Sequence, residues 1–245
     1  MDADRISKPL RKLHKLLADP PKELSPEEVH GLRTRCYRAQ STLRALGFEE
    51  ERRGSALIAA IEAIRKKAGK VRDADVLTSL AARLADQGRS DSLIQLVEEL
   101  GVRHDRFAAR LEKTIHSECR GMRNELKRYR KWIEKQLAAP DQKIAEQWSR
   151  NAMARSVLLS KEIAGWPKLR ADNLHPFRLK VKELRVVSQL SPAPEQEFVD
   201  ALKDVKDAAG EWHDWSELAV LAGRMLSDQG RNALVKHIAS IREER

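Results

Sequence analysis

Apolar residues recur along this chain with the spacing of α-helices, and alternation typical of β-strands is absent. In the segment 174–190, Leu174, Phe177, Val181 and Leu184 fall on one side of a helix, because each residue advances by about 100° around the helix axis. Glycine is also sparse, with 11 residues in 245. The pattern therefore predicts an all-α protein.

Proline and glycine residues divide this pattern into helices. We expect helices at about 4–18, 26–46, 53–67, 72–88, 91–137, 141–164, 174–190, 195–209, 215–228 and 231–244. The tetrapeptide SPEE at 25–28 is typical of a helix start, because it combines a capping serine, a first-turn proline and acids near the positive end of the helix dipole. A kink in the segment 91–137 is expected at Gly101 or Gly121.

Two glycines are expected to separate helices in equivalent places. Gly69 and Gly210 each precede an aspartate by four residues, at Asp73 and Asp214. Asp73 and Asp214 are then expected to cap the following helices, the second as a capping box with Glu217.

Beside the apolar side of the segment 174–190 runs a row of basic side chains. His175, Arg178, Lys182 and Arg185 stand at offsets 0, 3, 7 and 10, so that successive turns present a cation about every 5 Å. A helix that needed only solubility would mix acids and bases at i and i+4, and this row contains no acid. The row predicts a wall that faces a polyanion.

The helix predicted at 26–46 carries a weaker version of this row. Its basic members are His30, Arg33 and Arg44, and Tyr37 and Gln40 stand at the offsets that hold Lys182 and Arg185 in the other row. Arg38 is a further candidate, although it points away from the row. Binding through this half is expected to be weaker or differently placed.

Two additional basic rows have alternative interpretations. They contain Lys8 and Lys12 in the first helix, and Arg120, Arg123 and Lys127 in the helix predicted at 91–137. Each row can be a solvated face or part of the same anion site.

The charge balance narrows the class of partner. Lys and Arg outnumber Asp and Glu by 47 to 37, which gives a formal net charge of +10 and favours nucleic acids, anionic lipids or phosphate polymers. Aromatic residues make up only 4% of the chain, whereas a reader of single strands needs aromatic rings on which bases stack. No basic face borders an exposed apolar face, so a membrane-surface role is disfavoured.

The remaining composition suggests a cytoplasmic protein. Cys36 and Cys119 both fall at apolar helical positions and are expected to be reduced and buried. The N-terminal residues lack the apolar core of a signal peptide, and no run approaches the roughly 18 apolar residues of a membrane span.

The two halves of the chain repeat the same motifs in the same order. HGLR at 30–33 corresponds to HPFR at 175–178, and GKVRD at 69–73 corresponds to GEWHD at 210–214. The histidine precedes the glycine by 39 residues in the first half and by 35 in the second. Each half is therefore expected to form a bundle of about four helices that brings one basic row to a shared centre.

These motifs resemble the CHAD family, the conserved histidine α-helical domain. The resemblance rests on H-x-x-R-x-x-x-K-x-x-R at 175–185, its weaker partner at 30, and G-x-x-R-D-x-D-V-L at 69–77. It implies one domain of two pseudo-symmetric four-helix bundles, residues 1–139 and 140–245, around a basic central channel. It further implies binding of inorganic polyphosphate, a CYTH-type triphosphate-handling partner enzyme and a possible place at polyphosphate granules.

The chemistry of the candidate residues fits such a ligand. Arginine grips two phosphate oxygens at once and lysine adds a mobile charge. His30 and His175 either contact the anion or hold neighbouring helices together. Besides capping helices, Asp73 and Asp214 have a second interpretation, in which they orient an arginine or histidine of the rows.

An enzyme is the first competing interpretation. The sequence has no phosphate-cradling G-x-x-x-x-G-K-[ST], no H-E-x-x-H and no close His/Cys grouping for a metal, so we expect neither catalysis nor a cofactor. A phosphohydrolase that works through His175 and a nonspecific nucleic-acid or polyanion binder remain the alternatives.

Overall fold

The computed structural model describes residues 3–21, 23–85, 90–139, 143–191, 193–226 and 228–243. Within these ranges every regular element is helical, which confirms the all-α prediction. The elements are α1 (Ala3–Ala18), α2 (Pro26–Ala45), the short 3-10 helix η1 (Phe48–Glu50), α3 (Arg52–Ala85), α4 (Asp91–Leu137), α5 (Lys143–Ala164), α6 (Leu174–Ser188), α7 (Gln196–Met225) and α8 (Asp228–Glu243).

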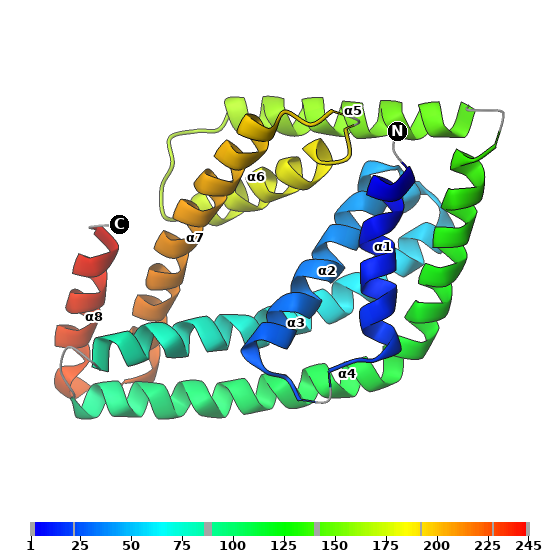
Figure 1. Cartoon of the computed structure of the whole chain (residues 1–245). Helices are drawn as coiled ribbons and strands as arrows, with labels where there is room; N and C mark the ends of the chain where they lie inside the picture. Colours follow the sequence, from blue (N-terminus) through cyan, green and yellow to red (C-terminus); the bar gives the residue numbers. More distant parts are fainter. Residues whose placement is uncertain are drawn as a thin grey trace.

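Local signals placed several helix ends correctly. The Ser25 hydroxyl accepts a hydrogen bond from the Glu28 N–H, and the Glu28 carboxylate accepts one from the Ser25 N–H, both at 3.3 Å. This reciprocal capping box starts α2, with Pro26 in the first turn. α4 has the predicted bounds and continues as one helix through Gly101 and Gly121, and Figure 1 shows that it bends part-way along its length, as the expected kink requires. Residue 140, at the expected division between the halves, lies outside the described ranges.

The prediction that glycines break two helices was wrong. α3 continues through Gly69 and Asp73, and α7 continues through Gly210 and Asp214, so neither aspartate caps a helix. A glycine inside a helix is less favourable than alanine by about 1 kcal/mol, which the packing of a long helix on both sides can offset. The capping box predicted for Asp214 and Glu217 is consequently absent, since both residues lie inside α7.

Three clusters of buried apolar side chains hold the helices together. The first joins α1, α2, the start of α3 and the second part of α4, and the third joins α5, α6 and Leu202 of α7. The second cluster joins Leu84 of α3 and Leu96 of α4 to Trp215 of α7 and Ile238 of α8. Apolar packing therefore links residues on both sides of the expected division at 139 and 140.

The path of the chain brings the two halves face to face. Figure 1 shows α5 and α6 along one edge, with α7 running from them to the far ends of α3 and α4, where α8 also lies. α2 contacts α6, and α3 contacts α7. The two H-x-x-R segments and the two glycine-containing helices thus meet at the centre. Among the described helices, none has both the length and the apolar character of a membrane span.

Candidate functional site

Basic side chains from four helices gather where α2 and α3 face α6 and α7. Their charges lower the pKa values of His30, His175 and Lys182 across the helix interfaces. We call this group the central basic cluster; it consists of His30 and Arg33 of α2, Arg65 and Arg72 of α3, His175, Arg178 and Lys182 of α6, and Lys206 and His213 of α7.

Lys182 lies at the middle of this cluster. Its ammonium nitrogen is 3.7 Å from the centre of the Tyr37 ring, and no carboxylate forms an ion pair with it within the described part of the chain. Burial, followed by the nearby charges of Arg33, Arg178, Arg65 and Lys206, lowers the pKa of Lys182 to about 7. At neutral pH, Lys182 is therefore protonated in only a fraction of the molecules, and a bound anion would favour its charged form.

The predicted mismatch between the two rows has a structural meaning. Tyr37 occupies in α2 the offset that Lys182 occupies in α6, and the two side chains stack on each other as a cation–π pair. At this position the first half therefore contributes the aromatic ring of Tyr37, which packs against Lys182 of the second half, and not a second lysine.

Arg33 and Arg178 occupy equivalent places above the two glycines. A Cβ atom on Gly210 would lie 2.8 Å from Nη2 of Arg178, and one on Gly69 would lie 3.6 Å from Nε of Arg33. The Arg178 Nε also donates a hydrogen bond of 3.4 Å to the Lys206 carbonyl oxygen. Gly210 therefore provides the space in which Arg178 passes close to α7, whereas at Gly69 the distance to Arg33 is one that an alanine would also allow.

The two aspartates point into the same region. The Asp73 carboxylate lies 3.9 Å from the Arg33 guanidinium, and the Asp214 carboxylate lies 3.5 Å from Nδ1 of His213. The surrounding protein raises the pKa of Asp73 although its side chain is 67% exposed. The aspartates are thus placed to orient basic groups.

The histidines of the repeat are held in their neutral form. Burial, then His213 and Arg178, lowers the pKa of His175, whose ring centre is 4.6 Å from that of His213. Burial, then Arg72 and Arg33, lowers the pKa of His30. Both residues nevertheless keep exposed surface, so an anion can reach them and favour the protonated form.

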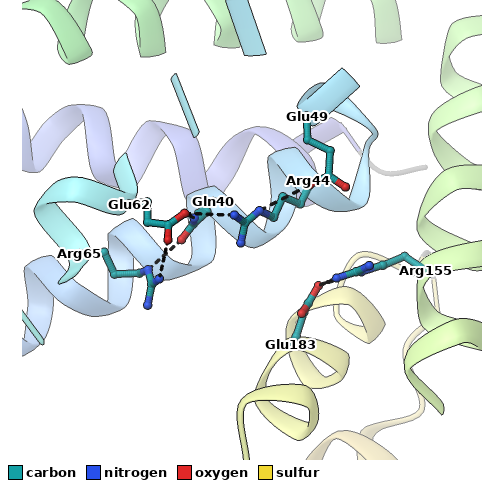
Figure 2. Close-up of polar contacts among 7 residues, drawn as sticks. All are labelled: Gln40, Arg44, Glu49, Glu62, Arg65, Arg155 and Glu183. Atoms are coloured by element: carbon teal, nitrogen blue, oxygen red, sulfur yellow. Dashed lines mark hydrogen bonds and ion pairs between the residues drawn. The ribbon is translucent and has the colours of Figure 1, made fainter. Parts of the chain in front are cut away.

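One of the predicted arginines, Arg44, forms an ion pair with a carboxylate on α3. The Glu62 carboxylate accepts hydrogen bonds from Arg44 at 3.1 Å and from Gln40 at 2.9 Å, and Arg44 also lies 3.6 Å from Glu49 (Figure 2). The Gln40 side-chain oxygen in turn accepts a hydrogen bond of 2.8 Å from Arg65. Arg65 of α3 thereby brings a further basic group towards the α2 row, although it also lies 3.8 Å from Glu62. The charges of Arg44 and Arg65 are thus both partly balanced by the same carboxylate.

Arg185 and the Arg155–Glu183 pair define the other end of α6. The Arg185 Nε donates a hydrogen bond of 3.3 Å to the Val199 carbonyl oxygen on α7. Figure 2 shows Arg155 of α5 reaching Glu183, with an Nε to carboxylate distance of 2.8 Å. These contacts fasten α6 to its neighbours, so Arg185 has a bond to the backbone that sequence reasoning did not foresee.

The remaining candidates fall into outlying groups. Arg38 and Lys12 join His30 on the wall of a cavity of about 580 Å³ between α1 and α2, which Lys15 and Arg35 also line. Arg123 and Lys127 lie near His14 of α1, whose pKa burial and these charges lower. Lys8 and Arg120 are exposed on α1 and α4. His30 is thus shared by the central basic cluster and the cavity.

Four members of the cluster were missed by sequence reasoning: Arg65, Arg72, Lys206 and His213. Arg72 and His213 hold the same position in the repeated G-x-x-x-D motif, so the repeat itself contained that signal. Arg65 and Lys206 are also equivalent, because each stands four residues before the glycine of its motif. Lys206 in addition pairs with Asp207.

In the ranges that the structure describes, no group of three or more His, Cys, Asp or Glu side chains is arranged to hold a metal ion. The two cysteines, Cys36 and Cys119, are free and buried, as expected.

Comparisons with known proteins agree with the architecture. The sequence model of the CHAD domain matches residues 4–223. The crystal structure of the CHAD domain from the plant Ricinus communis superimposes with a TM-score of 0.68 at 17% sequence identity, covering 99% of this chain and 84% of that chain. At this identity the likeness concerns the fold alone. No curated protein matches the sequence.

Proposed function

The chain belongs to the CHAD domain family, and on that premise we propose that it binds inorganic polyphosphate at the central basic cluster without hydrolysing it. The observation that carries the proposal is the position of Lys182, whose ammonium group lies 3.7 Å from the Tyr37 ring at the interface of the two halves. Burial and four neighbouring cations there lower its pKa to about 7. Cations held this close repel one another, and a bound polyanion would relieve that repulsion. Several members of the cluster have an acidic partner, such as Asp73 for Arg33, whereas Lys182 has none within the described residues.

The proposed contacts follow the repeat. His175, Arg178 and Lys182 present one basic group per turn of α6, about 5 Å apart, which suits an extended anion with one charge per phosphate. Arg33 and His30 approach from α2, and Arg65 and Lys206 add charge from α3 and α7. Asp73 and Asp214 orient Arg33 and His213 and do not touch the ligand.

A longer polyphosphate has a route out of the cluster. His30 lies on the wall of the cavity between α1 and α2, together with Lys12 and Arg38. We place the continuation of the ligand there, because His30 belongs both to the cluster and to the wall of this cavity, where bases outnumber the single acid Asp19. Arg123 and Lys127, near His14, form a separate basic surface on α4.

Charge alone does not distinguish polyphosphate from nucleic acid. A nonspecific nucleic-acid or polyanion binder is the second candidate, and a phosphohydrolase acting through His175 is the third. We also propose a cytoplasmic location, a place at polyphosphate granules and a CYTH-type partner enzyme. These three proposals rest on the family alone.

A competition titration tests the proposal. Labelled long-chain polyphosphate is bound at near-physiological salt and challenged with double-stranded DNA, single-stranded RNA and orthophosphate. We expect polyphosphate to remain bound in the presence of excess nucleic acid. The variant Arg178→Ala/Lys182→Ala should lose at least about tenfold in affinity, because each charge-assisted hydrogen bond contributes roughly 1.5–3 kcal/mol.

A matched variant controls for loss of charge. Arg110→Ala/Lys113→Ala removes one arginine and one lysine from the exposed face of α4 and should bind almost as the wild type does. Equal weakening of both variants, or displacement by nucleic acid at equal charge concentration, would make the protein a general polyanion binder. Release of orthophosphate from polyphosphate with divalent metal would instead support the phosphohydrolase.

A further inference from the structure

A separate cavity of about 380 Å³ lies between the start of α3 and the last part of α4. The residues that line it are Glu51, Arg52, Arg53, Arg128, Tyr129 and Trp132. None of them belongs to the central basic cluster. The volume falls within the roughly 300–1,000 Å³ of small-molecule sites.

The floor of this cavity is aromatic and held in place. Phe48 packs edge-on against both Tyr129 and Trp132, with ring centres 5.6 Å apart in each pair, and Trp148 packs on Trp132 at 5.4 Å. Tyr129 is buried, whereas Trp132 is only partly buried. Its ring therefore has an orientation fixed by its neighbours and a surface that a ligand can cover.

A close backbone contact fixes the position of Phe48. A Cβ atom on Gly54 would lie 2.1 Å from the Phe48 carbonyl oxygen, so only glycine allows η1 to fold this closely against the first turn of α3. The aromatic floor and the start of α3 are thus one rigid unit.

Three arginines form the rim. Arg52 and Arg53 begin α3 and make no ion pair within the described residues, whereas Arg128 lies 3.0 Å from Glu125. The first turn of α3 contains no acidic residue, so the positive end of the helix dipole is not balanced there by a side chain of that turn. Glu51 is the one acid on the wall of this cavity.

We propose that this cavity binds a nucleoside triphosphate, with the base against Trp132 and the phosphates on Arg52, Arg53 and Arg128. A flat ring gains from burial against an aromatic surface, and guanidinium groups match phosphate oxygens. A bare phosphate polymer has no group that could use the aromatic floor. The chemistry of this cavity therefore differs from that of the central basic cluster, and the proposal does not depend on polyphosphate binding.

Equilibrium dialysis with labelled ATP, together with quenching of tryptophan fluorescence, tests the site. We expect one ATP bound per chain, and unlabelled tripolyphosphate at equal charge concentration should leave most of it bound. Arg53→Ala should weaken ATP binding by about tenfold, because a charge-assisted contact is lost. Trp132→Leu should weaken it as well and should remove the quenching.

Variants elsewhere separate this site from the cluster. Arg110→Ala removes one exposed arginine on α4 and should leave ATP affinity within about twofold, the change expected for an exposed charge. Arg178→Ala/Lys182→Ala should do the same while it loses polyphosphate. The proposal is overturned if tripolyphosphate displaces ATP, if the cluster variant abolishes ATP binding, or if Arg53→Ala binds as the wild type does. Because Arg53 is exposed, its replacement should not disturb the fold, and a thermal melt verifies this.

Discussion

Lys182 shows how one residue can be poised by its surroundings. An amine ordinarily stays protonated far above neutral pH, and here burial and neighbouring cations lower its pKa to about 7. The Tyr37 ring, 3.7 Å from the nitrogen, provides the cation–π contact of the charged form. In the proposed function this lysine completes its protonation when the polyanion binds.

Polyphosphate affinity should consequently depend on pH. The pKa of Lys182 is about 7 in the free protein, and a bound anion raises it, so binding takes up a proton between those two values. We expect affinity to be high at pH 6 and to fall by up to about tenfold per pH unit as pH rises above 7. Dissociation constants at pH 6, 7, 8 and 9 measure this. His30 and His175, with pKa values below the ordinary one, add affinity at the acidic end.

Lys182→Arg is the matched control for that pH dependence. Arginine keeps its charge throughout this range, so the fall above pH 7 should disappear while binding at pH 9 becomes stronger than that of the wild type. The same pH profile in both proteins would mean that another group takes up the proton.

At the scale of the elements, α3 and α7 are long helices that each continue through a glycine beside an arginine from the neighbouring helix. The approach is tighter at Gly210 than at Gly69, since the added Cβ would lie 2.8 Å from Arg178 in the first case and 3.6 Å from Arg33 in the second. Continuous helices also carry Asp73 and Asp214 into the centre of the molecule. Helix continuity therefore decides what surrounds the basic residues.

Replacing the two glycines by alanine should separate stability from binding. Gly69→Ala meets only ordinary van der Waals contact, so it should stabilise α3 by up to about 1 kcal/mol and leave polyphosphate binding unchanged. Gly210→Ala forces the Arg178 guanidinium aside and should weaken binding several-fold with little gain in melting temperature. Thermal melts and titrations of the two variants measure both effects. Equal behaviour would show that Arg178 does not need its close approach to α7.

At the scale of the whole molecule, the second apolar cluster ties the ends of the two halves together. Leu84 and Leu96 come from α3 and α4, whereas Trp215 and Leu218 come from α7. The central basic cluster lies where these same halves meet, so its cations are brought together against their repulsion by apolar packing elsewhere. The geometry of the site thus depends on contacts that contain no charge.

This dependence predicts cooperative unfolding. Melting followed by helical circular dichroism and by tryptophan fluorescence should give one coincident transition, because the second cluster connects α3 and α4 to α7 and α8. Leu96→Ala, at a fully buried position, should destabilise the protein by roughly 2–5 kcal/mol and shift both signals together. Two separated transitions would show that the halves unfold independently. An exposed replacement on the same helix, Val102→Ala, serves as the control.

The sequence alone determined the features that depend on neighbouring residues. Helical periodicity, the Ser25 capping box, the bounds of α4 and the basic row of α6 were all predictable, because each arises within a few turns of one helix. The repeat of the two motifs also indicated which segments would correspond. Arg72 and His213 hold the same place in the two copies, so the repeat contained the signal for both residues.

Only the tertiary structure decided which of these charges remain available. Glu62 balances Arg44, Arg65 enters from α3, and Tyr37 lies under Lys182 across the interface between the halves. Gly69 and Gly210 were misread as helix ends because the local propensity of glycine gives no sign of an arginine that arrives from a distant helix. Ion pairs and desolvation depend on distances in space between residues far apart in the chain, and periodicity along one helix contains no information about those distances.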